Sequence, residues 1–225
     1  FARQITERQA LDAAHRDELS ELNLSYLRFV PKQFLEHLHR QSITAVKHGD
    51  QVQRTMTVLF SDIRAFTNLS EQIGPAKTFA FLNEFLGRIG PVVRKHNGFI
   101  DKYIGDAIMA LFDMPCDAVA ASIEMLETLS EMNRERVASD EAPIRIGIGL
   151  NTGELMLGIV GEDRRMEGTV IGDAVNLAAR LEALTKKYGV PLLISEATLT
   201  AVETCSEPDK YSGLLDKIRW VDAVQ

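Results

Sequence analysis

The segment that most constrains the fold is FIDKYIGDAIMALF, residues 99–112. Two short apolar runs flank the Gly105-Asp106 step, and a Gly-Asp step between such runs is a turn signal typical of a two-stranded β-hairpin. A buried hairpin has little use for charged residues, because burying a charge is costly unless the charge is paired. The charged residues inside this segment, Asp101, Lys102 and Asp106, therefore need an explanation beyond packing.

The regions around this hairpin predict one α+β domain. Apolar periodicity and turn residues predict a strand at 55–63, two helices within 68–98, a helix at 117–137, two strands around a turn at 151–153, a helix at 174–188 and a strand at 190–195. The helix at 174–188 is expected to have an Asp173 cap and to end at Gly189. This order predicts a mainly antiparallel sheet backed by helices, as in ferredoxin-like or palm-like folds.

The N-terminal residues 1–30 predict a long helix that ends before Pro31, because they contain neither glycine nor proline. A weak two-stranded coiled coil or signalling helix and a solvated linker helix are both compatible with the pattern, whose coiled-coil spacing rests on Leu19, Leu22, Tyr26 and Phe29. We divide the chain into an N-terminal helix and connector at 1–50 and a catalytic domain at 51–225. Because the chain begins with Phe1, we expect it to be a fragment whose upstream part holds a regulatory domain or a membrane anchor.

Composition and charge exclude some functions. With 45% hydrophobic and 25% charged positions in 225 residues, the chain has the composition of a globular protein with a sizeable core. The net charge of −7 argues against nucleic acid as a partner, because duplex binders are basic. Cys116 and Cys205 are far apart in sequence and form no C-x-x-C pair, so neither a zinc site nor a disulfide is expected, and a cytoplasmic location fits best.

Two aspartates are candidate metal ligands. Asp62 ends the predicted strand at 55–63, and Asp106 lies in the hairpin turn. Each alone is an ordinary cap or turn residue, but neighbouring strands would bring the two carboxylates together at one sheet edge. Such a pair repels unless a cation lies between its members, and oxygen ligands without histidine or cysteine suit Mg²⁺ or Mn²⁺.

Three other polar residues are candidates for ligand binding. Lys102 either extends to the surface or is held for a specific acceptor. Asn176 and Arg180 are four residues apart on the predicted helix at 174–188, so they share one face. An ordinary surface role, with Arg180 paired to Glu182 or Glu154, is the alternative.

Three segments together resemble a known family. LFSDIRAFT, FIDKYIGDAIMALF and GTVIGDAVNLAARLE are similar, in order and spacing, to the signature segments of the class III nucleotidyl cyclase catalytic domain, in particular that of bacterial-type adenylate cyclases. The resemblance runs from about residue 55 to about residue 200. It implies the cyclase version of the palm-like fold and the conversion of ATP to 3′,5′-cyclic AMP and pyrophosphate.

The resemblance also implies a metal and phosphate site. Asp62, Asp106 and the Ile63 carbonyl would hold two Mg²⁺ or Mn²⁺ ions, one acting on the ribose 3′-hydroxyl and the other on the leaving phosphates. Backbone N–H groups near Phe66 and Thr67 would bind the triphosphate at a helix start.

The remaining implied roles concern the base, the ribose and the α-phosphate. Lys102 and Thr169 would read adenine, Asn176 would orient the ribose, and Arg180 would stabilise charge on the α-phosphate. In the family the metal ligands and the other residues come from different subunits, which implies a homodimer with two equivalent sites.

Some features leave alternatives open. The hairpin's Asp101 receives no role and is expected to be a surface or turn residue. The family's C-terminal V-K-G-K-like segment is missing, and Lys217 or Arg219 are its candidate replacements. A guanylate cyclase and a non-catalytic module that dimerises and binds nucleotide are the alternative functions.

Overall fold

The computed structural model describes residues 16, 19–22, 25–26, 29–162, 165–205, 213 and 218–221. Its elements beyond residue 31 are α2 (Lys32–His37), the 3-10 helix η1 (Ile43–Ala45), β1 (Gln51–Ile63), α3 (Phe66–Ile73), α4 (Pro75–Lys95), β2 (Phe99–Ile104), β3 (Ala107–Phe112), α5 (Pro115–Ala138), β4 (Ile146–Glu162), β5 (Arg165–Ile171), α6 (Asp173–Tyr188), β6 (Leu192–Ile194) and α7 (Glu196–Glu203). Within these described ranges, no helix combines the length and apolarity needed to cross a membrane.

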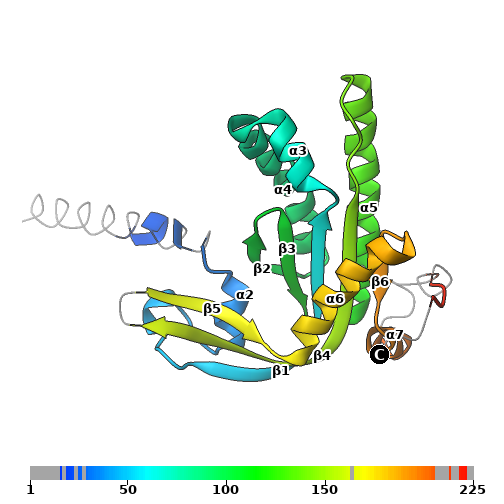
Figure 1. Ribbon diagram of the computed structural model, residues 1–225. Helices are drawn as coiled ribbons and strands as arrows, with labels where there is room; N and C mark the ends of the chain where they lie inside the picture. The colour runs from blue at the N-terminus through cyan, green and yellow to red at the C-terminus, as the bar shows by residue number, and fades with distance from the viewer. Residues whose placement is uncertain are drawn as a thin grey trace, which may run out of the picture.

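The strands form one six-stranded sheet with the order β2-β3-β1-β4-β5, in which β6 runs parallel to β4 and the other pairs are antiparallel. The whole of β1 pairs with β4, whereas β3 pairs only with the second half of β1. The start of β1 and the β4–β5 hairpin therefore extend as an arm away from α3, α4 and α5 (Figure 1). The predicted α+β fold with a mainly antiparallel sheet is confirmed.

Two apolar clusters cover the two faces of the sheet. The larger cluster joins α4, α5 and the sheet, and its most buried side chains include Phe85, Ile89, Phe112, Met125 and Ile148. The smaller one joins α2 and α6 to the arm, and it includes Phe34, Met56, Leu157 and Ala178. Burying large apolar side chains stabilises by about 1.5–3 kcal/mol each, so both faces of β1 are held firmly.

Helix α6 lies very close to β4 because β4 has glycine where the two elements cross. A Cβ at Gly149 would overlap the backbone of Ala178 and Glu182. A Cβ at Gly147 would overlap the ion pair between Arg64 and Glu182, whose Nη1 and Oε1 are 2.9 Å apart. The glycines and this ion pair fix α6 against the end of β1, where Asp62 lies.

The structure corrects three local predictions. The expected turn at 151–153 is the middle of β4, because these residues pair with 56–58 and the buried Asn151 side chain donates a hydrogen bond to the Ala174 carbonyl. Asp173 is the first residue of α6 and makes no cap bond, whereas Gly189 ends the helix as predicted. Strand β5 and helix α7 were not predicted.

The predicted N-terminal helix is described only in part. Residues 16, 19–22 and 25–26 are helical, and the other residues before 29 lie outside the described ranges. Leu19, Leu22 and Tyr26 are about half exposed, and Phe29 is more exposed still and lies in a turn. Pairing of this segment with a second copy stays a prediction.

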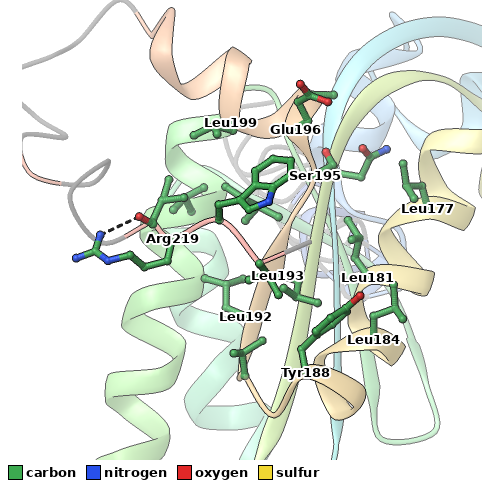
Figure 2. Close-up of a pocket in the computed structure, with 18 of the residues that line it drawn as sticks. Leu177, Leu181, Leu184, Tyr188, Leu192, Leu193, Ser195, Glu196, Leu199 and Arg219 are labelled. Atoms are coloured by element: carbon green, nitrogen blue, oxygen red, sulfur yellow. Dashed lines mark hydrogen bonds between the residues drawn. The ribbon is translucent and has the colours of Figure 1, made fainter. Parts of the chain in front are cut away.

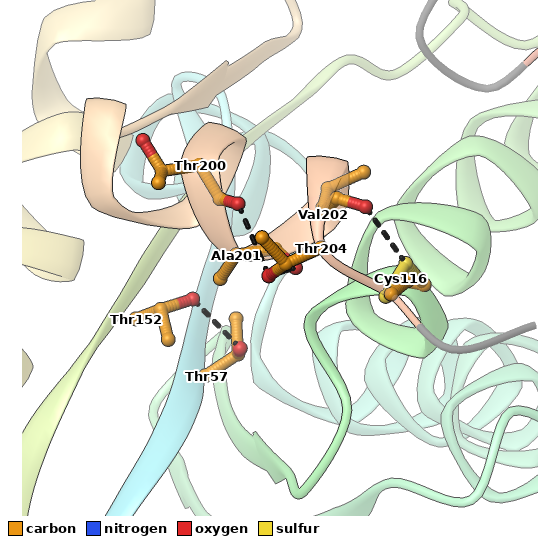
Figure 3. Close-up of a disulfide and its surroundings, with 8 residues drawn as sticks. Thr57, Cys116, Thr152, Thr200, Ala201, Val202 and Thr204 are labelled. Carbon is orange, nitrogen blue, oxygen red and sulfur yellow. Dashed lines mark hydrogen bonds between the residues drawn. A yellow bond between two sulfur atoms is a disulfide. The ribbon is translucent and has the colours of Figure 1, made fainter.

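The structure also contradicts the expectation of unpaired cysteines. Cys116, in the first turn of α5, forms a disulfide with Cys205, just after α7, and their Cα atoms are 6.7 Å apart (Figure 3). The two residues are 89 positions apart in sequence, and only the packing of α7 against α5 brings them together. Sequence spacing alone contains no information about such a long-range contact. The compartment stays a prediction.

Candidate active site

The predicted metal ligands lie together. Asp62 is next to last in β1, and Asp106 lies in the turn between β2 and β3, which the β1–β3 pairing brings beside the end of β1. The backbone N–H of Ile63 lies 3.1 Å from Asp62 Oδ1 and 3.3 Å from Asp106 Oδ2. One N–H group thus binds both carboxylates and holds them near each other.

The electrostatics of this pair favour a cation. Burial, together with a hydrogen bond to the adjacent Asp62 carboxyl group and repulsion by its charge, raises the pKa of Asp106 to about 7. Within the described ranges, no three histidine, cysteine or acidic side chains gather as a metal site. Two carboxylates and a backbone carbonyl suit Mg²⁺ or Mn²⁺, which typically takes one or two protein carboxylates with substrate phosphates. The donor set therefore fits the metal that the sequence predicts.

The predicted phosphate-binding residues begin helix α3. Ala65 has a left-handed conformation with φ 57°, and Phe66 and Thr67 follow as the first turn. The Phe66 ring stacks on Phe81 of α4 at 6.5 Å, which anchors this turn to the core. The first N–H groups of a helix have no partner within it, so they are available to an anion.

Lys102 lies beside strand β5, although β2 and β5 are at opposite ends of the strand order. Its Nζ is 3.1 Å from Glu167 Oε1 and 3.4 Å from the Gly168 carbonyl oxygen. Thr169 is the next residue of β5 and is partly buried. The structure thus brings Lys102 to the segment that contains its predicted partner, Thr169.

Asp101, predicted to be a surface or turn residue, instead lies within β2 with its side chain buried. Its side chain is only 2% exposed, and its Oδ2 lies 3.6 Å from Lys102 Nζ. The β2–β3 register shifts between Ile100 and Lys102, so Asp101 is the extra residue of a β-bulge. Burial raises the pKa of Asp101 to about 6, while the Lys102 charge acts in the opposite direction.

Glu167 was not among the predicted site residues. Glu167 becomes relevant only through the position of β5, a strand that the pattern did not predict. The bulge at Asp101 has a weak sequence signal, namely two adjacent charged residues within an otherwise apolar strand.

Asn176 and Arg180 are exposed on α6, one turn apart, as predicted. Glu182 pairs with Arg64 and Glu154 with Gln53, so neither acid pairs with Arg180 as the surface alternative supposed, and the role of Arg180 stays a prediction. Within the described residues, the Asp62–Asp106 pair and the predicted base-reading residues come from other elements than α6, namely β1, the β2–β3 hairpin and β5.

Arg180 also lines a cavity of about 990 Å³ between α6, β6, α7 and residues 218–221 (Figure 2). The walls are largely apolar and include Leu177, Leu181, Leu184, Leu193 and Trp220. Asp62, Asp106, Lys102 and Thr169 do not line it. Arg219, a candidate replacement for the missing phosphate-binding lysine, lies on this wall, and Lys217 is outside the described residues.

Comparison with known proteins shows the family. The model of the adenylate and guanylate cyclase catalytic domain matches residues 49–211. An adenylate cyclase of Anabaena cylindrica is 41% identical over 96% of this chain and 44% of its own length. Among solved structures, the guanylyl cyclase Cya2 is 36% identical with a TM-score of 0.62, covering 69% of this chain and 81% of Cya2. A bacterial light-regulated adenylyl cyclase is 26% identical with a TM-score of 0.72, and the match covers 86% of this chain and 57% of the chain of that cyclase.

The chain belongs to the class III adenylate and guanylate cyclase catalytic domain family. It is therefore a catalytic domain of nucleotide cyclases, as its three signature segments predicted. The chain spans less than half the length of the Anabaena relative.

Proposed function

We propose that this chain is the catalytic domain of an adenylate cyclase, which converts ATP to 3′,5′-cyclic AMP and pyrophosphate. The observation that carries the choice of ATP is the approach of Lys102 to the Gly168–Thr169 segment of β5. Adenine presents an acceptor at N1 and a donor at its 6-amino group. A lysine donates and a threonine hydroxyl accepts, so this pair matches adenine, whereas guanine presents a donor at N1.

Each remaining residue has a role in this proposal. Asp62, Asp106 and the Ile63 carbonyl hold two Mg²⁺ or Mn²⁺ ions, which, when bound, lower the pKa of the 3′-hydroxyl and neutralise charge on the leaving phosphates. The N–H groups at Phe66 and Thr67 bind the triphosphate. Asn176 orients the ribose so that its 3′-oxygen faces the α-phosphorus, and Arg180 stabilises the negative charge that develops there.

We also propose that the active site is shared between two copies of the chain. The exposure of Asn176 and Arg180 on α6 leaves both side chains accessible to a second copy, which supports a site in which one copy contributes the carboxylates and the other contributes α6. A C2 homodimer then contains two equivalent sites.

The test is complementation between two inactive variants. Asp62→Ala and Arg180→Ala are assayed with ATP or GTP and Mg²⁺ or Mn²⁺, separately and mixed, and both cyclic nucleotides are quantified. Each variant alone should be inactive, and the mixture should recover about a quarter of the wild-type rate, because half of the dimers are mixed and each has one intact site. Mixtures that stay inactive while dimers exchange would contradict a shared site.

A guanylate cyclase is the second candidate, supported by the similarity to Cya2. Changing Lys102 to Glu and Thr169 to Cys should shift preference from ATP toward GTP if these residues read the base. Wild-type activity with GTP alone would instead favour this candidate. A chain that binds nucleotide and dimerises without forming either product would favour the non-catalytic module.

Regulation by an upstream domain completes the proposal. The helical residues before Pro31 and the exposure of Leu19, Leu22 and Tyr26 support an N-terminal segment that pairs with its copy and transmits a signal to the shared sites. Deletion of residues 1–30 should reduce dimerisation and turnover. Unchanged values of both would contradict this role.

A further inference from the structure

The amine of Lys102 already has three oxygen neighbours within its own chain. They are Glu167 Oε1 at 3.1 Å, the Gly168 carbonyl at 3.4 Å and Asp101 Oδ2 at 3.6 Å. The lysine ammonium donates hydrogen bonds to the first two of these oxygens, whereas Asp101 Oδ2 lies at ion-pair distance. A nucleobase that accepts a hydrogen bond from Lys102 must therefore compete with these oxygens for the amine.

The two carboxylates around Lys102 differ in their freedom to move. The Asp101 side chain is 2% exposed and belongs to the β-bulge that also carries Lys102. The Glu167 side chain is 57% exposed and lies on the β4–β5 arm. Glu167 can exchange its contact with Lys102 for water at low cost, whereas Asp101 has no such alternative.

The bulge gives Asp101 its position. In a regular strand, adjacent side chains point to opposite faces of the sheet, so residues 101 and 102 would be separated. The extra residue locally disrupts this alternation, and bulges near active sites commonly redirect a side chain. Here the bulge accompanies a buried carboxylate beside the amine that we assign to base reading.

We propose that Asp101 is a positioning residue that fixes the Lys102 amine, and that Glu167 is a displaceable partner that competes with the nucleobase for the same amine. This inference rests on the proposed role of Lys102 in reading adenine. It assigns opposite effects to two acidic residues that contact one lysine. Asp101 favours nucleotide binding, and Glu167 opposes it.

The test compares steady-state kinetics with ATP for Glu167→Gln and Asp101→Asn in the dimeric protein. Glu167→Gln should lower KM for ATP about threefold with little change in kcat, because an exposed ion pair no longer competes. Asp101→Asn should raise KM about tenfold and reduce the preference for ATP over GTP, because the amine loses its fixed partner. Glu154→Gln, which removes one exposed charge from β4, is the matched control and should change neither value.

The outcomes separate this inference from the proposed function. If Lys102→Glu with Thr169→Cys does not shift base preference, the base-reading role fails, and this inference fails with it. If that shift occurs but Glu167→Gln leaves KM unchanged or raises it, the competition is contradicted. If Asp101→Asn folds, as judged by thermal unfolding, and keeps the wild-type KM and ATP preference, the positioning role is contradicted. Glu167→Gln changes an exposed side chain, so it tests the competition even if Asp101→Asn does not fold.

Discussion

The β2–β3 hairpin contributes to two charged clusters, one of like charges and one of opposite charges. At its turn, Asp106 meets Asp62, and two carboxylates of like charge lie close together with a shared N–H donor. On its edge strand, Lys102 lies among Asp101, Glu167 and the Gly168 carbonyl. The first cluster consists of two acids, whereas the second contains a lysine.

This difference predicts how the energy of each cluster changes when its ligand binds. The Asp62–Asp106 pair gains favourable interactions when a cation arrives, because repulsion is replaced by attraction. The Lys102 cluster gives up a contact when a ligand arrives. In the protein without ligands, the turn therefore holds two repelling charges and the strand holds opposite charges. Neutralising Asp106 at the turn should stabilise the protein, whereas neutralising Lys102 on the strand should destabilise it.

The largest expected effect is on catalysis at the turn. Asp106→Asn should lower the rate of cyclic nucleotide formation by about 10³-fold or more, because a metal ligand is lost. The same change should raise the melting temperature of the metal-free protein, because one of two repelling carboxylates becomes neutral. Assays with Mn²⁺ and calorimetry in chelator measure both. A variant that is inactive and also less stable would contradict the repulsion.

The next largest effect is the stabilisation by added metal, which should depend on the Asp62–Asp106 cluster and not on the Lys102 cluster. Mn²⁺ at about 100 times its dissociation constant should stabilise the wild type by about 2.7 kcal/mol. Lys102→Met should retain this gain, and Asp106→Asn should lose most of it. Thermal unfolding with and without Mn²⁺ measures the difference, and equal stabilisation of all three proteins would place the metal elsewhere.

Removal of the strand's cation should destabilise the protein. Lys102→Met leaves the buried Asp101 carboxylate without its ion pair, and we expect the free energy of unfolding to fall by about 1–3 kcal/mol at pH 8. Denaturant titration measures it. In the double variant Lys102→Met, Asp101→Asn, much of the stability should return, and a further fall would show that the pair contributes little.

The smallest expected effect is a pH dependence from Asp101. Its pKa is raised from 3.8 to about 6 in the folded protein, so between these values the folded state binds more protons than the unfolded state. Stability should therefore fall as pH rises from about 4 to 6, and Asp101→Asn should remove about 1–3 kcal/mol of that fall.

Controls for this pH series must allow for Asp106. Because the pKa of Asp106 is raised to about 7, Asp106 also makes stability fall with rising pH up to about pH 7. This contribution is present in both the wild type and Asp101→Asn. Asp140→Asn, in an exposed loop at φ 60°, is the matched control and should keep the wild-type slope. An Asp101→Asn protein with that same slope would contradict the raised pKa of Asp101.

Local patterns predicted much of the fold. The hairpin at 99–112 and the helix that ends at Gly189 were predicted because their turn signal, periodicity and stop residue lie within a few positions. The turn predicted at Asn151 was wrong because the same residue types occupy the middle of β4, where β1 and α6 supply partners. Tertiary contacts override such local preferences.

In the candidate site, too, local sequence patterns did not predict the features that depend on tertiary contacts. The Asp62–Asp106 proximity was predicted, because two strands of one antiparallel sheet place their ends together. Burial of Asp101, the approach of Glu167 to Lys102 and the cysteine pairing were missed. Each depends on a bulge or on contacts between distant elements, and single-sequence periodicity does not contain that information.

The disulfide between Cys116 and Cys205 closes a covalent loop that contains nearly all of α5 together with β4, β5, α6, β6 and α7. The carboxylate pair and Lys102 precede this loop, whereas Thr169, Asn176 and Arg180 lie inside it. A protease cut between β4 and β5 therefore leaves both fragments joined through the disulfide. Such a nicked chain would migrate as one species without reductant and as two species with it.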